Sequence, residues 1–312
     1  MIPSENLPEA SPQLQTPVVL LIFNRPDVTR RVFEVIRQVR PMQLFVIADG
    51  PRADRPGEEM LCHQARAVLD QVDWPCQVLT NFANSNLGCR RRVVSGLDWV
   101  FSQVEEAIIL EDDCLPDPTF FRFCSELLER YRDEPRIGQI GGINFQFAGS
   151  GGEHSYYFSR YNHIWGWASW RRAWCLNDDT MSSWPAFRDG GDLWRYIASP
   201  AERRYWVNAL DRVASGELDT WDCQWTLACW RHNLLTVLPR VNLVSNIGFG
   251  PSATHTTEAS QFADIPSAAM CFPLDHPDEL IINESADAYT ARLMYRPLTL
   301  MRKLAILLYG RG

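Results

Sequence analysis

The chain has 312 residues, of which 46% are hydrophobic and 22% are charged, and its formal net charge is −8 at neutral pH. These values are typical of a globular protein of one large or two small domains, and the negative charge disfavours a general nucleic-acid-binding role. The nine cysteines include no Cys-x-x-Cys pair, which favours reduced thiols in a cytosolic protein over a disulfide framework or a zinc site.

The first 16 residues are polar and acidic, and we expect them to be disordered. They lack the basic segment and the apolar segment of a signal peptide. No apolar run in the chain reaches the length of a membrane span. We therefore expect a cytoplasmic protein, and the basic, apolar C-terminal tail leaves open a peripheral contact with the inner face of the membrane.

From residue 17 onward, short apolar runs alternate with segments that carry apolar residues at helical spacing. This pattern predicts strands and helices in alternation. The strands are expected within residues 16–26, 42–52, 77–82 and 106–113, and the helices within residues 27–40, 58–72 and 90–104. Such alternation is typical of a parallel α/β sheet with right-handed crossover connections. The first strand is not followed by Gly-x-Gly-x-x-Gly, which disfavours a dinucleotide site of that type.

Polar side chains follow the ends of these strands. Arg25 follows the first strand, Asp49 follows the second, and the fourth ends in three adjacent acids, Glu111, Asp112 and Asp113. Because the carboxyl ends of parallel strands lie on one edge of a sheet, where such sheets bind ligands, we expect these side chains to meet in one site. Arg25 could bind a phosphate, and Asp49 could accept a hydrogen bond from a base or a ribose.

Repulsion among the three adjacent carboxylates costs free energy unless a cation lies beside them. One interpretation is a divalent metal that also neutralises a diphosphate. The other is a solvated strand end, in which Asp112 or Asp113 caps the helix that begins near Thr119. The cluster Arg90–Arg92 leaves two interpretations as well, because Arg90 could hold a phosphate or the cluster could be a solvated helix face.

Ten of the twelve tryptophans lie within residues 156–230, which sets the second half of the chain apart. Most are expected in the core, but Trp165 or Trp167 could stack on a sugar ring. Asp222, in Thr-Trp-Asp-Cys-Gln-Trp, could act as a general base or cap the helix that follows. His255, in a loop rich in glycine, serine and threonine, could complete a metal site, contact a phosphate or be an exposed loop histidine.

Residues 84–124 contain a specific run, NSNLGCRRRVVSGLDWVFSQVEEAIILEDDCLPDPTFFRFC. This run resembles the core of GT-A-type glycosyltransferases. It is similar to the family of N-acetylglucosaminyltransferases that begin complex N-glycans and to bacterial family-2-like transferases described as haemolysin-like. The resemblance is weaker over residues 17–60, patchy over residues 160–260 and absent from the tail. It implies a GT-A fold, in which a mostly parallel, Rossmann-like α/β sheet flanked by helices adjoins an aromatic-rich acceptor half.

The resemblance also implies a role for each acid and for the arginine at the strand ends. In that family the last acid of the triple binds a Mn²⁺ ion on the donor's diphosphate, so Asp113 is expected to hold Mn²⁺ or Mg²⁺. Asp112 and Glu111 would contact the ribose or the donor sugar. Arg25 and Asp49 would contact the nucleotide.

The implied reaction is an inverting, metal-dependent transfer of a sugar from a nucleotide-sugar donor, expected to be UDP-linked, to a hydroxyl of a carbohydrate or glycoconjugate acceptor. Asp222 matches the family's base, and Cys223 replaces a second acid. Asp178 or Asp179 would be the next candidates. Two alternatives stay open, a pyrophosphorylase-like nucleotidyltransferase and a non-catalytic carbohydrate-binding protein. The first requires a lysine near the phosphates, and the chain's single lysine is Lys303.

We expect residues 17–125 to form the donor-binding half of one GT-A domain and residues 126–275 to form its acceptor and catalytic half. Residues 276–312 are expected to form a basic, apolar and helical tail. This tail could lie at a membrane surface near a lipid-linked acceptor, or it could pack on the domain or on a second copy in a homodimer. No nucleic-acid partner is expected.

Overall fold

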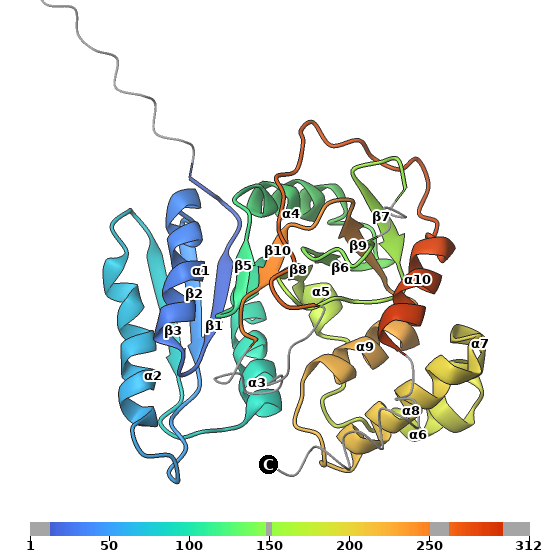
Figure 1. The fold of residues 1–312 in the computed structure, drawn as a ribbon, viewed down its shortest axis with the longest axis horizontal. Helices are drawn as coiled ribbons and strands as arrows, with labels where there is room; N and C mark the ends of the chain where they lie inside the picture. The colour runs from blue at the N-terminus through green and yellow to red at the C-terminus, as the bar shows by residue number, and fades with distance from the viewer. Residues whose placement is uncertain (1–12, 148–151, 250–261, 296–312) are drawn as a thin grey trace, which may run out of the picture.

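A mixed sheet of eight strands runs through the protein in the order β3-β2-β1-β4-β8-β6-β9-β7 (Figure 1). The structure is a computed structural model and describes residues 13–147, 152–249 and 262–295. The strands of this sheet are β1 (Val18–Ile22), β2 (Gln43–Ala48), β3 (Gln77–Phe82), β4 (Glu106–Glu111), β6 (Ile137–Gly141), β7 (Tyr156–Ser159), β8 (Trp167–Trp170) and β9 (Leu235–Pro239). A small second sheet pairs β5 (Cys114–Pro116) with β10 (Val244–Asn246).

Helices lie in both halves of the described part of the chain. Those of the first half are α1 (Pro26–Val39), α2 (Glu58–Arg66), the 3-10 helix η1 (Ala67–Gln71), α3 (Cys89–Phe101) and α4 (Thr119–Arg130). Those of the second half are α5 (Arg171–Trp174), α6 (Trp184–Asp189), α7 (Asp192–Tyr196), α8 (Pro200–Ala214), α9 (Asp222–Arg231) and α10 (Glu284–Met294).

The predicted alternation of strands and helices is confirmed for the first half of the chain. Strands β1 to β4 pair in parallel, and each lies within its predicted range. The helix predicted over residues 58–72 is divided into α2 and η1. Beyond β4 the sheet is mixed, because β8 runs antiparallel to β4 and β6. Four of the seven strand pairs in the described sheet are parallel, which confirms the expected mostly parallel α/β class.

The strands direct alternate side chains into two cores, one on each face of the sheet. In β1, Val18 and Leu20 pack in the core that contains α1 and α4, whereas Val19 and Leu21 pack in the core that contains α3, α5 and α9. Because helices cover both faces, every residue of β1 is buried and the strand is a continuous apolar run.

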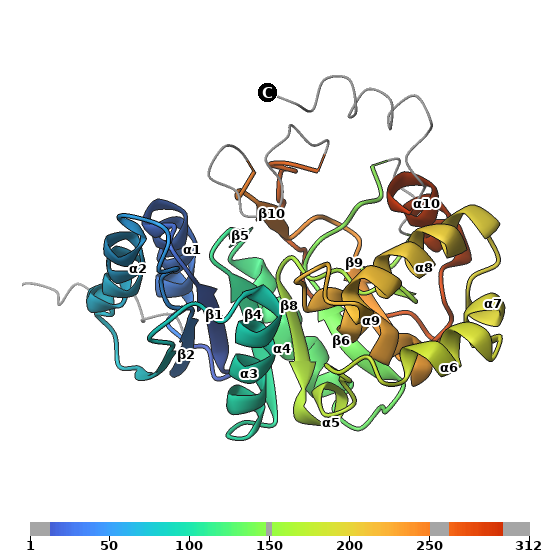
Figure 2. The ribbon, with the colours of Figure 1, turned by 90° about the horizontal axis from the view of Figure 1, so that it is seen from below.

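A third core contains many of the tryptophans of the second half. Helices α6, α7 and α8 gather at the end of the molecule opposite β1 to β3 (Figures 1 and 2). Trp184, Trp206 and Trp230 are buried in this core, together with Tyr295 at the end of α10. Core packing therefore accounts for much of the tryptophan-rich region.

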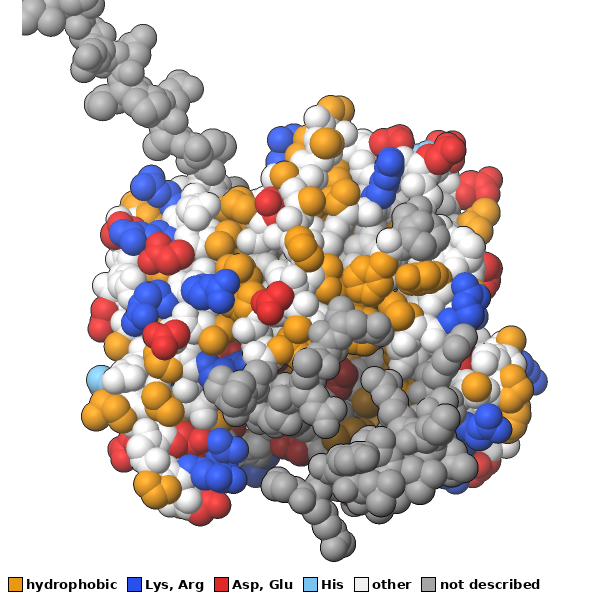
Figure 3. Space-filling view, viewed as in Figure 1, with side chains coloured by type: hydrophobic (Ala, Val, Ile, Leu, Met, Phe, Trp, Pro, Cys, Tyr) orange, Lys and Arg blue, Asp and Glu red, His pale blue; other side chains and the backbone are white. Residues whose placement is uncertain are grey.

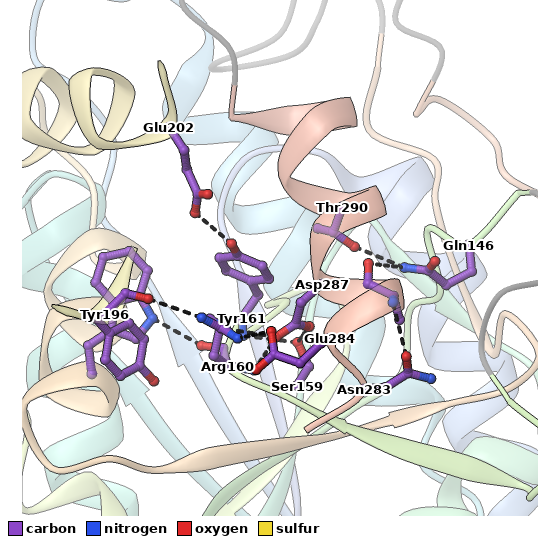
Figure 4. A network of polar contacts seen from close by, with 12 residues as sticks. Gln146, Ser159, Arg160, Tyr161, Tyr196, Glu202, Asn283, Glu284, Asp287 and Thr290 are labelled. Atoms are coloured by element: carbon purple, nitrogen blue, oxygen red, sulfur yellow. Dashed lines mark hydrogen bonds and ion pairs between the residues drawn. The ribbon is translucent and has the colours of Figure 1, made fainter. Parts of the chain in front are cut away.

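Helix α10 is fastened to the sheet by a buried polar network (Figure 4). Asp287 accepts a hydrogen bond from the Ser159 hydroxyl at 2.6 Å and one from Arg160 Nε at 3.0 Å, and Arg160 also pairs with Glu284. Burial raises the pKa of Asp287, although these donors oppose the shift. The described part of the tail thus packs on the domain. Residues 296–312 lie outside the described residues, and the membrane contact and the homodimer stay predictions.

The segment before β1 is also part of the packed domain from residue 13 onward. The Leu14 N–H donates to the Val39 carbonyl at 3.2 Å, and the Leu14 carbonyl accepts from the Met42 N–H at 2.9 Å. Residues 1–12 of the segment expected to be disordered lie outside the described residues. No helix in the described ranges is both long enough and apolar enough to cross a membrane.

Replacing Asp287 by alanine should destabilise the fold strongly, because the largely buried Arg160 would lose its buried counter-ion. Breaking a buried ion pair in this way typically costs about 3–5 kcal/mol. Glu284→Gln removes the other acid from the same arginine, but Glu284 is 74% exposed, so its loss should cost less than about 1 kcal/mol. Urea unfolding of both variants measures the difference in the free energy of unfolding. Equal losses of stability would contradict the prediction that the buried ion pair of Arg160 contributes more than the exposed one.

Candidate functional site

The strand ends on one edge of the sheet surround a cavity of about 470 Å³. In the register of the parallel strands, Ile22 of β1 lies beside Ala48 of β2, and Leu21 lies beside Glu111 of β4. The segments that follow these strands therefore meet, as expected. The volume is in the range of small-molecule sites. Figure 3 shows acidic side chains in the hollow at the centre of the molecule.

Most of the residues proposed from the sequence line this cavity. Those that do are Arg25, Asp49, Glu111, Asp112, Asp113, Trp165 and Asp222. Arg90 and Trp167 lie elsewhere, and His255 lies outside the described residues. The lining thus combines the first half of the chain, which supplies most of the charges, with segments from the second half.

The guanidinium of Arg25 lies between two of the three adjacent acids. It pairs with the Asp112 carboxylate through Nε and Nη2, and Nη2 is 3.0 Å from Asp113 Oδ2. All three side chains are largely buried, with exposed fractions of 16% for Arg25, 5% for Asp112 and 17% for Asp113. The chain itself therefore supplies part of the positive charge that the three acids require.

Burial shifts the pKa of two of the three acids. Burial raises the pKa of Glu111 well above its usual value, and the charges of Asp113 and Asp112 raise it further. Burial also raises the pKa of Asp112, to about 6, although Arg25 opposes the shift.

The alternative of a solvated strand end with a helix cap is wrong, because Asp117 accepts the hydrogen bond from the first N–H of α4, at 2.8 Å.

Asp49 organises the corner of the cavity beside β2. Its Oδ1 accepts hydrogen bonds from the N–H groups of Gly50 at 2.8 Å and Leu87 at 2.9 Å, and its Oδ2 accepts from the Asn86 side chain at 3.0 Å. Burial raises the pKa of Asp49, and these backbone donors oppose the shift. Asp49 therefore fixes the loop that contains Asn86, and its carboxylate keeps further acceptor positions for a ligand.

Arg52 also lines the cavity, although the sequence analysis did not single it out. Its guanidinium pairs with the buried carboxylate of Glu58, which also accepts a hydrogen bond from the Asn24 side chain at 2.9 Å. The hydrogen bond from Arg52 lowers the pKa of Glu58, despite partial burial. The ion pair with Glu58 orients the Arg52 guanidinium beside the cavity, where it can donate hydrogen bonds to an anionic or polar ligand.

The rotation of α3 decides which arginine of its first turn reaches the cavity. Arg90 lies away from it and pairs with Asp179, with Nε 2.8 Å from Oδ1. Arg92 lines the cavity, is 7% exposed and donates to the Asn81 carbonyl at 2.9 Å. The position proposed for Arg90 is thus taken by Arg92, because two steps along a helix turn a side chain through about 200°.

The direction of β8 decides which tryptophan lines the cavity. Because β8 runs antiparallel to β4, the chain enters it from the edge where β4 ends, and Trp165 precedes it there. Trp165 lines the cavity, with its ring edge-to-face against Phe249 at 5.7 Å between centroids. Trp167 is fully buried and stacks on Trp221 at 5.5 Å, so it supports the cavity wall from behind. The predicted ligand contact by Trp167 therefore does not fit its position.

Asp222 lines the cavity and belongs to the second half of the chain, whereas the three acids belong to the first half. It is the first residue of α9, whereas the N-cap position is occupied by Trp221, so the helix-cap alternative is wrong. The Thr220 hydroxyl donates to Asp222 Oδ1 instead. The Cys223 side chain also forms a hydrogen bond with the Asp222 carboxylate, which keeps further acceptor positions for a ligand.

Asp219 joins the loop that carries Asp222 to the first half of the chain. Its two oxygens accept hydrogen bonds from the N–H groups of Cys89 at 2.8 Å and Arg90 at 3.1 Å, so it caps α3 from 130 positions further along the chain. Gly88 has a φ of 83°, and a Cβ there would lie 2.7 Å from Asp219 Oδ2. In the sequence, the only signal that points to Asp219 is its spacing from Asp222, Asp-x-x-Asp.

The described residues contain no group of three or more histidine, cysteine, aspartate or glutamate side chains that could hold a metal ion. A Mg²⁺-like ion binds through one or two carboxylates when substrate phosphates supply other ligands. Asp113 offers such a carboxylate, and six acids against three arginines in the lining favour added positive charge. The site therefore fits a metal that arrives with a diphosphate and does not resemble a preformed metal centre.

No family model matches the chain, and no curated protein matches it. Among solved structures, it is similar to a mannosyltransferase from Pyrobaculum calidifontis in complex with GDP-Man and Mn²⁺, with 12% identity, a TM-score of 0.39 and 73% of each chain covered. It is also similar to a CMP:2-keto-3-deoxy-manno-octonic acid synthetase complexed with CTP, with 13% identity, a TM-score of 0.35, and 72% of this chain and 89% of that chain covered.

A third similar structure is mouse xyloside xylosyltransferase 1 in its apo form, with 11% identity, a TM-score of 0.33, and 70% of this chain and 84% of that chain covered. Likenesses at these values carry no inference about the reaction. The function has to be inferred from the cavity and its residues.

Asp219→Ala should destabilise the protein by about 1–2 kcal/mol, the usual cost of losing a helix cap. The two N–H groups at the start of α3 would lose their partner, and the favourable interaction with the helix dipole would be lost as well. Asp219→Asn keeps an acceptor oxygen and should lose less. Glu217→Ala, in the same loop, removes only a surface ion pair with Arg212 and is the control. Chemical unfolding followed by tryptophan fluorescence measures all three, and an unaffected Asp219→Ala protein would rule out the cap.

Proposed function

We propose that the protein is a GT-A-type glycosyltransferase that moves a sugar from a nucleotide-sugar donor to a hydroxyl of a carbohydrate or glycoconjugate. The observation that carries this proposal is one cavity with Arg25 and the three adjacent acids on its first-half wall and Asp222 on its second-half wall. One wall can hold an anionic leaving group, and the other can accept a proton. The resemblance of residues 84–124 to GT-A transferases supports the same function.

The first-half wall suits the nucleotide of the donor. Arg25, Arg52 and Arg92 offer the positive charge for phosphates or for the carbonyl oxygens of a base. Asp49 and Asn86 offer carboxylate and amide oxygens as acceptors for a base or a ribose, since the Asn86 amide nitrogen already donates to Asp49 and Gly50. We propose a UDP-linked donor, with Asp112 and Glu111 nearest to the ribose or the sugar.

Asp113 is the residue proposed to hold Mn²⁺ or Mg²⁺. Bound there with the diphosphate, such an ion supplies positive charge that offsets the negative charge growing on the leaving group. Arg25, already beside Asp113, can donate hydrogen bonds to the same phosphates. Both cations would act on the side of the sugar from which the nucleoside diphosphate departs.

Asp222 is proposed to be the general base. The carboxylate oxygen that does not bind Thr220 would take the proton of the acceptor hydroxyl while the hydroxyl oxygen attacks the anomeric carbon and the bond to the diphosphate breaks. Thr220 orients the carboxylate through its hydrogen bond to the other oxygen. Attack opposite the leaving group is a single displacement, so the configuration inverts and no covalent protein intermediate is required.

Trp165 and Phe249 are proposed to hold the acceptor. Their rings lie at the cavity wall supplied by the second half of the chain. Aromatic faces bind the apolar faces of sugar rings and leave the hydroxyl groups free for reaction. This placement brings an acceptor hydroxyl to the same wall as Asp222.

Incubation with nucleotide sugars and Mn²⁺ tests the reaction class. A transferase should release nucleoside diphosphate slowly by transfer to water and faster when the acceptor is present. A nucleotidyltransferase would instead form pyrophosphate from a nucleoside triphosphate and a sugar phosphate. A non-catalytic carbohydrate-binding protein would release neither product. Release of nucleoside diphosphate from UDP-sugars, and not of pyrophosphate, is the expected outcome.

Asp222→Asn should lower turnover by roughly 10²–10⁴-fold, the usual contribution of a positioned base, and leave donor affinity near wild type. The substitution keeps the size of the side chain and one oxygen for Thr220, so thermal stability should change little. Glu217→Gln, an exposed acid of the same loop, is the matched control. Steady-state transfer gives the rates, and NMR of the product gives its configuration. Near-normal turnover, or a product that retains configuration, would place the base elsewhere.

A further inference from the structure

We propose that Arg25 is an internal counter-ion that keeps a divalent metal from binding at Asp113 until a nucleotide diphosphate is present. This inference deepens the proposed function, and its nucleotide half rests on that function. It concerns the order in which the cavity takes its ligands. Its basis is a guanidinium that already contacts the carboxylate from which the metal would be bound.

Arg25 binds its two aspartates in different ways. Both Nε and Nη2 donate to the Asp112 carboxylate, whereas only Nη2 reaches Asp113, at 3.0 Å from Oδ2. Asp112 is also the more buried of the two, with 5% of its side chain exposed against 17% for Asp113. The contact with Asp112 therefore anchors the guanidinium, and the contact with Asp113 is the one that a ligand can replace.

Asp113 is enclosed from the other side by the segment after β10. The Ile247 N–H donates to the Asp113 carbonyl at 2.9 Å, which brings Gly248 against the Asp113 side chain. A Cβ on Gly248 would collide with Asp113 Oδ2 and would lie 2.7 Å from Arg25 Nη1. This packing holds the guanidinium and the carboxylate together, and it leaves little space for the water that a hydrated ion gives up reluctantly.

Within the described ranges, Arg25 is the only cation that forms an ion pair with Asp112 or Asp113. Burial lowers the pKa of Arg25, but the charges of the two aspartates outweigh this effect and raise it, so the guanidinium stays charged. A metal that binds Asp113 alone has to displace this charge and then lie beside it. Repulsion between the two cations weakens such binding.

A nucleotide diphosphate removes this conflict. Its oxygens bring negative charge between the two cations and supply ligands to the metal and acceptors to Arg25. Arg25 can then remain on Asp112 while Nη2 exchanges Asp113 for a phosphate oxygen. Metal and nucleotide therefore bind with positive coupling, and each raises the affinity of the other by the same factor.

Calorimetric titration with Mn²⁺, first alone and then with saturating UDP or GDP, tests the inference. Wild-type protein should bind Mn²⁺ at least about tenfold more tightly with nucleotide, a coupling of ordinary size. Arg25→Gln should bind Mn²⁺ without nucleotide at least about tenfold more tightly than wild type, because the carboxylates have lost their counter-ion. Arg25→Lys keeps the charge but loses the bidentate anchor, and its affinity should lie in between.

Two further variants separate the role of Arg25 from a general change in charge. Arg90→Gln removes an arginine that lies outside the cavity and pairs with Asp179, and should bind Mn²⁺ alone as wild type does. Adding Asp113→Asn to Arg25→Gln should abolish the gained affinity. Circular dichroism and thermal melting establish that each variant is folded, and Arg25→Lys carries the test if Arg25→Gln does not fold.

A folded Arg25→Gln protein that binds Mn²⁺ no more tightly than wild type without nucleotide overturns the inference. A wild-type protein that binds Mn²⁺ equally well with and without nucleotide, while Arg25→Gln shows no gain, overturns it as well. If Arg25→Gln gains affinity but neither UDP nor GDP affects Mn²⁺ binding in any variant, the counter-ion role is supported and the proposed nucleotide-sugar function fails.

Discussion

Three adjacent carboxylates at the end of a buried strand are the constraint on which the rest of the site depends. They repel one another in a region of low dielectric, and without a cation they would oppose folding. The fold meets this constraint by placing β1 directly beside β4, so that Arg25 reaches Asp112 and Asp113. The arginine lowers the negative charge of the site without removing it, and the residual negative charge favours a further cation.

The cavity lies between the two halves of the chain, and hydrogen bonds to backbone groups align its walls. Asp219 caps α3 from the far half, and Ile247 binds the backbone of Asp113. These contacts fix the position of Asp222 relative to the acids. Such pre-organisation is what a reaction between a bound donor and a bound acceptor requires.

The tryptophan-rich region contributes mainly stability. Trp167 is buried in one core, and Trp184 and Trp230 are buried in another. The polar network around Asp287 joins α10 to Ser159 of β7. Among the tryptophans proposed as ligand contacts, Trp165 alone lines the cavity. Its position depends on the rigid packing behind it, since Trp167 stacks on Trp221 in the adjoining wall.

The sequence by itself determined the first four strands, their helices and the residues at the strand ends. These features are local, because apolar periodicity marks a buried strand and the residue after a parallel strand must lie at the ligand edge of the sheet. For this reason Arg25, Asp49 and the three adjacent acids could be assigned to one site before the fold was known.

Only the tertiary structure decided which neighbouring side chains reach that site. Arg92 takes the place proposed for Arg90 because the rotation of α3 against the sheet, and not the sequence of its first turn, directs each arginine. Trp165 is preferred over Trp167 because β8 pairs antiparallel to β4, which the alternation of the first half did not predict. Asp219 could not be assigned because its partners lie 130 positions away, and such long-range hydrogen bonds leave no periodic pattern in a single sequence.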